Sequence, residues 1–225
     1  MRKMITVKIN GEERQYPQGA TYEDVANDYQ QEYENLIALA ARDGKIRELF
    51  KKLTRDCEVT FFTLKDDVGN KTYVRSATML FLKAVFDVYG REAAQSCRVE
   101  FAIGNGSYIS PKGKINATEE NAAKIRNRMR ELVEAKTPFL KRSYSLDNAM
   151  ELFRKEGMKD KEKLFRYRRG SFVNIYEMDG YYDYYYGYML PNAGYVKWFD
   201  VIAYEDGFML LLPDKKDPPH VKPFQ

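Results

Sequence analysis

The side chains best suited to chemistry gather late in the chain, in the stretch "YYDYYYGYMLPNAG" at 181–194. Tyrosine fills six of the eight positions 181–188, around Asp183 and Gly187. Tyrosines can stack on single-stranded nucleobases or pack as core, and a lone carboxylate can orient water. Three interpretations therefore stand: a nucleic-acid platform, ordinary core, or the wall of a cleft whose reactive residues have been exchanged.

Histidine and cysteine, the side chains that acid–base catalysis and zinc binding most often use, are scarce in this sequence. His220 is the single histidine and lies in a proline-bounded tail. Cys57 and Cys97 stand far apart, without the spacing of a metal or redox motif, and we expect buried free thiols. Free thiols are typical of a cytoplasmic protein. We expect no zinc here.

No nucleotide-binding loop is recognisable. Gly113-Lys114 lacks the glycine that a phosphate-binding loop needs, because position 108 is Tyr108. Gly104 and Gly106 begin a dinucleotide pattern that is not completed. We therefore expect no cofactor in these residues.

Composition indicates a globular chain of one or two domains. Of its 225 residues, 44% are hydrophobic and 31% are charged. No apolar run approaches the roughly 18 residues of a membrane span, and the start "MRKMITVKIN" is too polar for a signal peptide. We expect a cytoplasmic protein with no membrane partner; its oligomeric state stays open.

Positive charge is concentrated between residues 141 and 170. That segment holds ten Lys or Arg against five Asp or Glu, and basic residues alternate with aromatics in "KLFRYRRGSF". Such a pattern suits a phosphate backbone, or else a solvated helix face followed by an edge strand. The candidate RNA or anion surface comprises Lys141, Arg142, Lys163, Arg166, Arg168 and Arg169.

The first 65 residues predict a small mixed sheet with one helix. "MITVKI" alternates and ends at Asn10-Gly11, a strong hairpin signal. A helix capped by Thr21 follows, then "LIALAA", the turn Asp43-Gly44, "KIREL" and the apolar strand "CEVTFFTL". This ββαββ order is that of a β-grasp domain over residues 1–65.

Residues 70–213 predict a second, α+β domain. A helix over 74–89 is apolar nearly all round and should be buried. Helices are also expected over 118–136, capped by Thr118, and from Ser145 to Gly157. From Leu164 onward the pattern is mostly strand, with the tyrosine run on one strand, and the whole chain is therefore α+β with an antiparallel sheet.

The order of these elements resembles the front half of threonyl-tRNA synthetase, meaning its TGS domain and its editing domain. The most telling stretches are "FTLKDDVGNKTYVRS", "NGSY", "ATEENAAKIRNRMRELVEAK" and "KRSYSLDNAMELF". In that family the editing domain removes wrongly attached serine from tRNA, using an H-x-x-x-H and a C-x-x-x-H. The resemblance places these motifs on Arg75 and Met79, and on Tyr185 and Met189, so all four reactive positions are exchanged.

The resemblance implies an editing cleft that has lost its reactive residues and binds a ligand without catalysing a reaction. Its candidate lining comprises Arg75, Met79, Lys83, Tyr108, Asp183, Tyr185 and Met189. Arg75 suits an anionic or nucleotide-like ligand, or a salt bridge to Asp183 or Asp87. The alternative is a residual aminoacyl-tRNA deacylase, with water positioned by Asp183 and assisted by Lys83 or Tyr108.

A second resemblance covers nearly the whole chain. The stretches "EYENLIALAARDGKIREL", "LFRYRRGSFVNIYEMDGYYDYYYGYMLPNAGYVKWFDVIAYEDGFMLLLP" and "PPHVKPF" are similar to the front of a bacterial family of uridine-kinase-like nucleoside kinases. It implies a binding or regulatory module, with 214–225 as a linker to a kinase domain. ATP and Mg would belong to that domain, and the partners would be the kinase domain and possibly tRNA, other RNA or a nucleotide.

Overall fold

The computed structural model describes residues 3–167 and 170–224 and divides into two compact units. The first unit runs to Ser76 and includes Gly187–Pro191 and Pro213–His220. The second comprises Ala77–Tyr186, Asn192–Leu212 and the residues from Val221 onward. Both sheets and helices contribute to each unit, so the fold class is α+β, as the sequence predicts.

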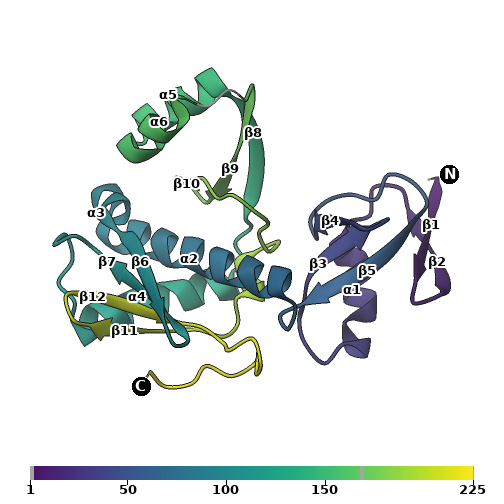
Figure 1. Ribbon diagram of the computed structural model, residues 1–225, viewed down its shortest axis with the longest axis horizontal. Coiled ribbons are helices and arrows are strands. Elements are labelled where there is room, and N and C mark those ends of the chain that lie inside the picture. The colour runs from purple at the N-terminus through teal and green to yellow at the C-terminus, as the bar shows by residue number, and fades with distance from the viewer. Residues whose placement is uncertain (1–2, 168–169, 225) are drawn as a thin grey trace. The chain divides into compact units, whose positions relative to one another are not determined.

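The first unit is built on a five-stranded sheet in the order β2-β1-β5-β3-β4 (Figure 1). Its strands are β1 (Met4–Ile9), β2 (Glu12–Pro17), β3 (Ile37–Arg42), β4 (Lys45–Glu48) and β5 (Cys57–Thr63). Only β1 and β5 pair in parallel. The two predicted hairpins form at Asn10-Gly11 and Asp43-Gly44, where all four residues have positive φ.

One short helix, α1 (Tyr22–Tyr29), covers this sheet. Thr21 and Asp24 form a capping box at its start, and Tyr22, Val25, Ala26 and Tyr29 are buried. Tyr29 meets Phe61 of β5 with ring centroids 6.2 Å apart. A helix packed on a mixed sheet with a central parallel pair is the arrangement that the β-grasp prediction requires.

Helix α2 (Asp67–Tyr89) starts earlier than the predicted residue 74. All but the first residue of the polar stretch "DDVGN" (66–70) lies in this helix, which includes Gly69. A Cβ at Gly69 would lie 2.0 Å from the Thr63 carbonyl oxygen, so only glycine allows this close approach. The unit boundary falls within α2 at Ser76, and the predicted domain limits at 65 and 70 stay predictions.

The core of the second unit joins α2 to a four-stranded antiparallel sheet in the order β11-β12-β7-β6. The strands are β6 (Arg98–Ile103), β7 (Gly106–Ser110), β11 (Asp200–Tyr204) and β12 (Gly207–Leu211). Phe81 of α2 packs on Phe208 of β12, with ring centroids 6.3 Å apart. Helix α3 (Arg91–Ser96) follows α2, and α4 (Glu119–Glu134), capped by Thr118, packs against β11 (Figure 1).

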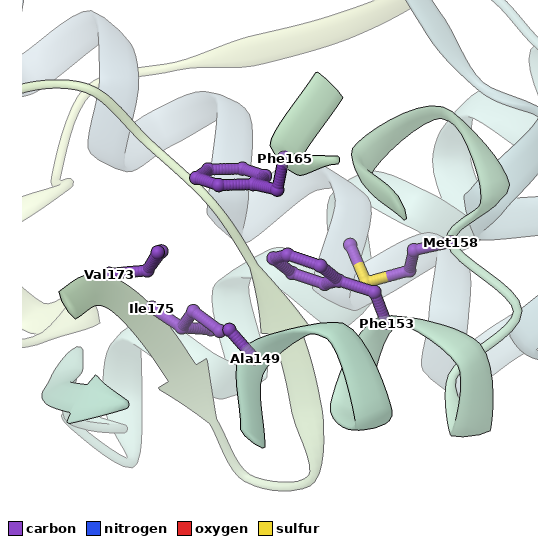
Figure 2. Packing of buried hydrophobic residues seen from close by; sticks show 6 residues of the cluster. All are labelled: Ala149, Phe153, Met158, Phe165, Val173 and Ile175. Atoms are coloured by element: carbon purple, nitrogen blue, oxygen red, sulfur yellow. The ribbon is translucent and has the colours of Figure 1, made fainter. Parts of the chain in front are cut away.

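A second antiparallel sheet has the order β10-β9-β8 and is covered by two helices (Figure 1). Its strands are β8 (Leu140–Ser145), β9 (Phe172–Met178) and β10 (Tyr181–Asp183); its helices are α5 (Leu146–Lys155) and α6 (Lys159–Phe165). Figure 2 shows the cluster between them, formed by Ala149, Phe153, Met158, Phe165, Val173 and Ile175. Ser145 caps α5 and Gly157 has positive φ beyond its end, as the sequence predicts, whereas α6 is a helix that the sequence does not predict.

The prediction of one strand through the tyrosine run was wrong. Strand β10 ends at Asp183, and no strand forms from 184 to 191. Gly187 has φ of 136°, a value that interrupts a regular strand. Within the run, Tyr182 and Tyr184 contact the α5–α6 cluster, whereas Tyr186 is 87% exposed.

No helix within residues 3–167 and 170–224 combines the length and the apolar character that crossing a bilayer requires.

Candidate functional site

A pocket of about 230 Å³ lies in the second unit, among α2, α3, the start of β6, the α5–α6 connection and β10. Aromatic side chains form one wall: Phe86, Tyr181, Tyr182 and Tyr185. Charged side chains also line it, beside aliphatic and small residues: Arg91, Arg98, Glu156, Asp160, Lys161 and Asp183. Pockets for drug-sized ligands span roughly 300–1,000 Å³, so this one suits a single base, sugar or aminoacyl group.

Asp183 is the buried polar centre of this pocket. Its Oδ1 accepts from the Tyr184 N–H at 2.7 Å and lies 3.3 Å from Lys161 Nζ. The Tyr181 hydroxyl donates to Oδ2 at 3.3 Å. Burial raises the pKa of Asp183, and the charge of Lys161 opposes part of the rise. When ionised, the carboxylate can accept hydrogen bonds from hydroxyl or ammonium groups of a ligand.

The other charged wall is held by contacts between α3 and the end of α5. Arg91 Nη1 lies 2.8 Å from Glu156 Oε2, and the Gln95 amide donates to the Glu156 carbonyl. Arg98 Nη1 donates to the Gln95 carbonyl at 2.6 Å. These contacts set the pocket's width, because they join α3 to the segment that carries Lys161.

Two ring contacts hold the aromatic side chains of the pocket. Phe86 of α2 contacts Tyr181 with ring centroids 5.6 Å apart, and Tyr185 meets the buried Tyr176 edge-on at 6.5 Å. Cys97 also lines the pocket, and burial raises the pKa of its thiol to about 12. The thiol is therefore protonated at neutral pH and is a poor nucleophile.

Two predicted site residues have partners elsewhere in the second unit. Lys83 Nζ, which is buried, donates to Asp87 Oδ1 and to the Asp179 carbonyl, both at 2.7 Å. The Tyr108 hydroxyl donates to Asp206, which raises the pKa of Tyr108 to about 12. Among the described residues, the pocket lining includes Asp183 and Tyr185 but neither Lys83 nor Tyr108.

Arg75 and Met189 belong to the first unit. Arg75 Nη1 donates to the Tyr188 carbonyl at 2.5 Å, and its guanidinium lies against Gly187. Met189 is fully buried, with its Sδ 3.9 Å from the Ser76 hydroxyl. Its N–H donates to Glu48 at 3.2 Å. Arg75 is therefore engaged with main chain, and Met189 serves as core.

Met79, one turn after Arg75 on α2, is fully buried in the second unit. The two carboxylates considered as partners of Arg75 are engaged with other cations: Asp183 with Lys161, and Asp87 with Lys83 and Arg128. Whether the seven predicted residues share one cleft stays a prediction, because they are divided between the two units.

The predicted basic surface is partly neutralised. Arg142 Nε lies 2.7 Å from Glu177, and Lys141 Nζ lies over the Tyr176 ring. Lys163 and Arg166 are exposed on and after α6. Arg168 and Arg169 lie outside the described residues. Nearby, Tyr167 and Phe172 are 85% and 67% exposed, so aromatic and basic groups do share this part of the unit.

Sequence reasoning missed Arg91, Gln95, Glu156 and Lys161 as pocket residues. They come from α3, the end of α5 and the start of α6. For Glu156 and Lys161 the only signal is the run "EGMKDKEK", whose three basic and three acidic residues by themselves indicate a solvated surface. Pocket placement requires knowing that α3 faces the α5–α6 connection, and no local pattern encodes that.

Comparison with known proteins finds similarity to threonyl-tRNA synthetases, in agreement with the first resemblance. No protein-family model matches the chain. The threonine–tRNA ligase of Thermotoga neapolitana is 28% identical over 208 residues, which cover 89% of this chain and 31% of that protein. That of Porphyromonas gingivalis is 25% identical over 194 residues, covering 84% and 29%. That of Maricaulis maris is 27% identical over 193 residues, covering 85% and 30%.

The chain thus spans about a third of the length of the curated relatives it matches. It is similar to part of threonyl-tRNA synthetases over most of its own length. The relatives named here include no kinase, and the resemblance to nucleoside kinases gains no support from them.

Proposed function

We propose that this chain is a tRNA-related binding module. It binds the 3′ end of an RNA and does not hydrolyse an aminoacyl ester attached there. The observation that supports binding is the pocket with aromatic lining in which the buried Asp183 carboxylate pairs with the partly exposed Lys161. Its size suits one terminal nucleoside or aminoacyl group rather than a longer ligand.

The exchanged positions support the absence of catalysis. Met79 and Met189 are buried thioethers that neither accept nor release a proton at neutral pH. Arg75 is permanently charged and engaged with the Tyr188 carbonyl. Tyr185 stands in the pocket wall where the resemblance places a cysteine. A general base of the kind the editing reaction uses is missing from these four positions.

RNA reaching the pocket would be attracted by the basic surface around α6. Exposed Lys163 and Arg166 contribute a salt-dependent attraction, and exposed Tyr167 offers a stacking surface. We further propose that the first unit acts as a TGS domain.

A titration of acceptor-stem RNA hairpins tests the proposal. Fluorescence anisotropy would compare a hairpin with its complete 3′ terminus and one lacking the last nucleotide, at about 50 and 200 mM salt. Stacking of one base contributes about 1–3 kcal/mol, so removing the terminal nucleotide should weaken binding by roughly 5- to 150-fold. Tyr182→Ala, which removes part of the stacking wall, and Asp183→Asn, which removes the buried carboxylate, should each reduce this difference. Lys124→Ala, which removes an exposed lysine paired with Glu120 on α4, should retain it.

Equal affinity for the two hairpins in the wild type would refute terminal recognition. A deacylation assay with tRNA mischarged with serine tests the other half of the proposal. We expect no hydrolysis above the uncatalysed rate; turnover lost in Asp183→Asn would instead establish the residual deacylase.

Attachment to a nucleoside kinase is a finer proposal that rests on the second resemblance alone. The relatives found favour the tRNA-related function. A phosphate-binding loop of the G-x-x-x-x-G-K-[ST] type in the reading frame downstream of residue 225 would support the kinase parent. Pull-down of that kinase domain by this chain would then test whether the module contacts it.

A further inference from the structure

Lys83 is the one lysine or arginine that is buried among the residues the structure describes, and it is only 2% exposed. It lies on α2 between the buried residues Leu82 and Ala84. Lysine is almost never fully buried unless its charge is paired, because removing an ammonium group from water is costly. The groups that pair with this ammonium therefore show what it holds in place.

The Lys83 ammonium joins α2 to the turn between β9 and β10. Its Nζ donates to Asp87 Oδ1, one turn further along α2, and to the Asp179 carbonyl, both at 2.7 Å. Asp179 and Gly180 have φ of 43° and 79° and form the two-residue turn of the β9–β10 hairpin. The bond from Lys83 to the Asp179 carbonyl, which we call the turn clamp, therefore fixes this turn to the helix.

The strand that follows this turn carries the polar centre of the pocket. Strand β10 has only three residues, Tyr181–Asp183, and lies at the edge of its sheet beside β9. On the side of α2, Phe86 contacts Tyr181 with ring centroids 5.6 Å apart. Lys83 and Phe86 are three residues apart and lie on the same face of α2. The turn clamp and the ring contact thus hold β10, and with it the Asp183 carboxylate, against one face of the helix.

Stability alone does not favour a lysine at position 83. An apolar side chain of similar length would fill the same space without the free-energy cost of burying a charge. Asp87 would keep a cation, since its Oδ2 lies 2.8 Å from Arg128 Nε. The Asp179 carboxylate is 72% exposed and would be hydrated. What the lysine adds is therefore the position of the turn.

We propose that Lys83 is a positioning residue of the pocket. Through the turn clamp it sets the place of Tyr181 and Asp183, which line the pocket, and acts on the ligand only through them. This inference rests on the proposed function of the pocket. It predicts that loss of the turn clamp impairs binding of the RNA terminus and leaves the fold intact.

Lys83→Met in the full chain tests this with the two RNA hairpins. The variant should lose most of the roughly 5- to 150-fold difference in affinity between the complete hairpin and the one lacking its last nucleotide. Its urea midpoint should stay close to that of the wild type, because Asp87 keeps Arg128. Asp87→Asn is the matched control, because it removes the other partner of Lys83 and leaves the turn clamp. It should lower the urea midpoint, since a buried ammonium loses its carboxylate, yet keep the difference between the hairpins.

Hydrogen exchange measures the turn clamp without any ligand. In Lys83→Met the main-chain N–H groups of residues 179–183 should exchange faster than in the wild type, whereas those of α4 should be unchanged. Circular dichroism identifies a variant that fails to fold. In that case Lys83→Met combined with Asp87→Leu decides, because the pair is then replaced by apolar side chains and Arg128 keeps Glu131 at 2.7 Å.

The outcomes separate this inference from the proposed function. If the wild type discriminates between the hairpins and Lys83→Met does so equally, the positioning role is overturned and the proposed function stands. Unchanged exchange at 179–183 would also overturn it, as would a urea midpoint that falls as far in Lys83→Met as in Asp87→Asn. Equal affinity of the wild type for both hairpins would instead refute the proposed function, and the exchange measurement would still decide whether Lys83 fixes the turn.

Discussion

Gly187 and Arg75 are in contact, and the contribution of this contact to the free energy of unfolding can be estimated from the structure. Gly187 has φ of 136°, a backbone angle that residues other than glycine rarely adopt. A Cβ there would lie 2.6 Å from Arg75 Cζ and 2.7 Å from its Nη2. Gly187→Ala must therefore strain the backbone and displace the guanidinium from the Tyr188 carbonyl.

Backbone strain and the lost Arg75 hydrogen bond each lower the free energy of unfolding, and the two contributions can be separated. Holding alanine at this φ costs about 1–3 kcal/mol. Losing a hydrogen bond from a charged donor costs about 1.5–3 kcal/mol more. In the wild-type background, Gly187→Ala should thus lower the free energy of unfolding by roughly 2.5–6 kcal/mol. In an Arg75→Ala background only the backbone strain is left.

Urea denaturation of the wild type, Gly187→Ala, Arg75→Ala and the double variant measures the coupling free energy between the two positions. We expect it to equal the hydrogen-bond contribution, about 1.5–3 kcal/mol. Gly19→Ala is the matched control, because Gly19 has φ of 94° with nothing within 4 Å of its Cβ position. It should show strain but no coupling to Arg75. Equal costs of Gly187→Ala with and without Arg75, within about 0.5 kcal/mol, would refute the contact.

Three further expectations follow from the second unit and the exchanged positions. Because burial raises the folded-state pKa of Asp183, its contribution to stability is present at pH values below its unfolded pKa and is lost as pH rises through the folded value. Urea unfolding between about pH 4 and 8 should show the wild type losing stability relative to Asp183→Asn as pH rises; parallel curves would contradict this. Cys97, with its pKa raised to about 12, should react with a thiol reagent at pH 8 more slowly than the half-buried Cys57, and labelling followed by mass spectrometry would show the order. Elemental analysis of purified protein should find no stoichiometric zinc, since positions 75, 79, 185 and 189, where the resemblance places the editing motifs, carry neither histidine nor cysteine.

Local patterns determined much of the fold. Asn10-Gly11 and Asp43-Gly44 fixed two hairpins, because their backbones accept the positive φ of such turns. Thr118 and Ser145 fixed two helix starts, because their hydroxyls accept main-chain N–H groups. The α+β class follows from these local signals. The absence of histidine and cysteine at 75, 79, 185 and 189 is likewise a matter of residue type and needs no knowledge of the fold.

The pocket and the course of the tyrosine run were decided by tertiary structure. Alternating tyrosines predict a strand, yet Gly187 and the approach of Arg75 end regular structure after Asp183. Lys161, distant in sequence from Asp183, becomes its partner only when α6 packs beside β10. Helix α2 can begin at Asp67 beside the Thr63 carbonyl only because residue 69 is a glycine, since that carbonyl leaves no room for a side chain there. Each of these outcomes depends on a contact between residues that are far apart along the chain, or on the space that a neighbouring group leaves. Local sequence patterns specify neither.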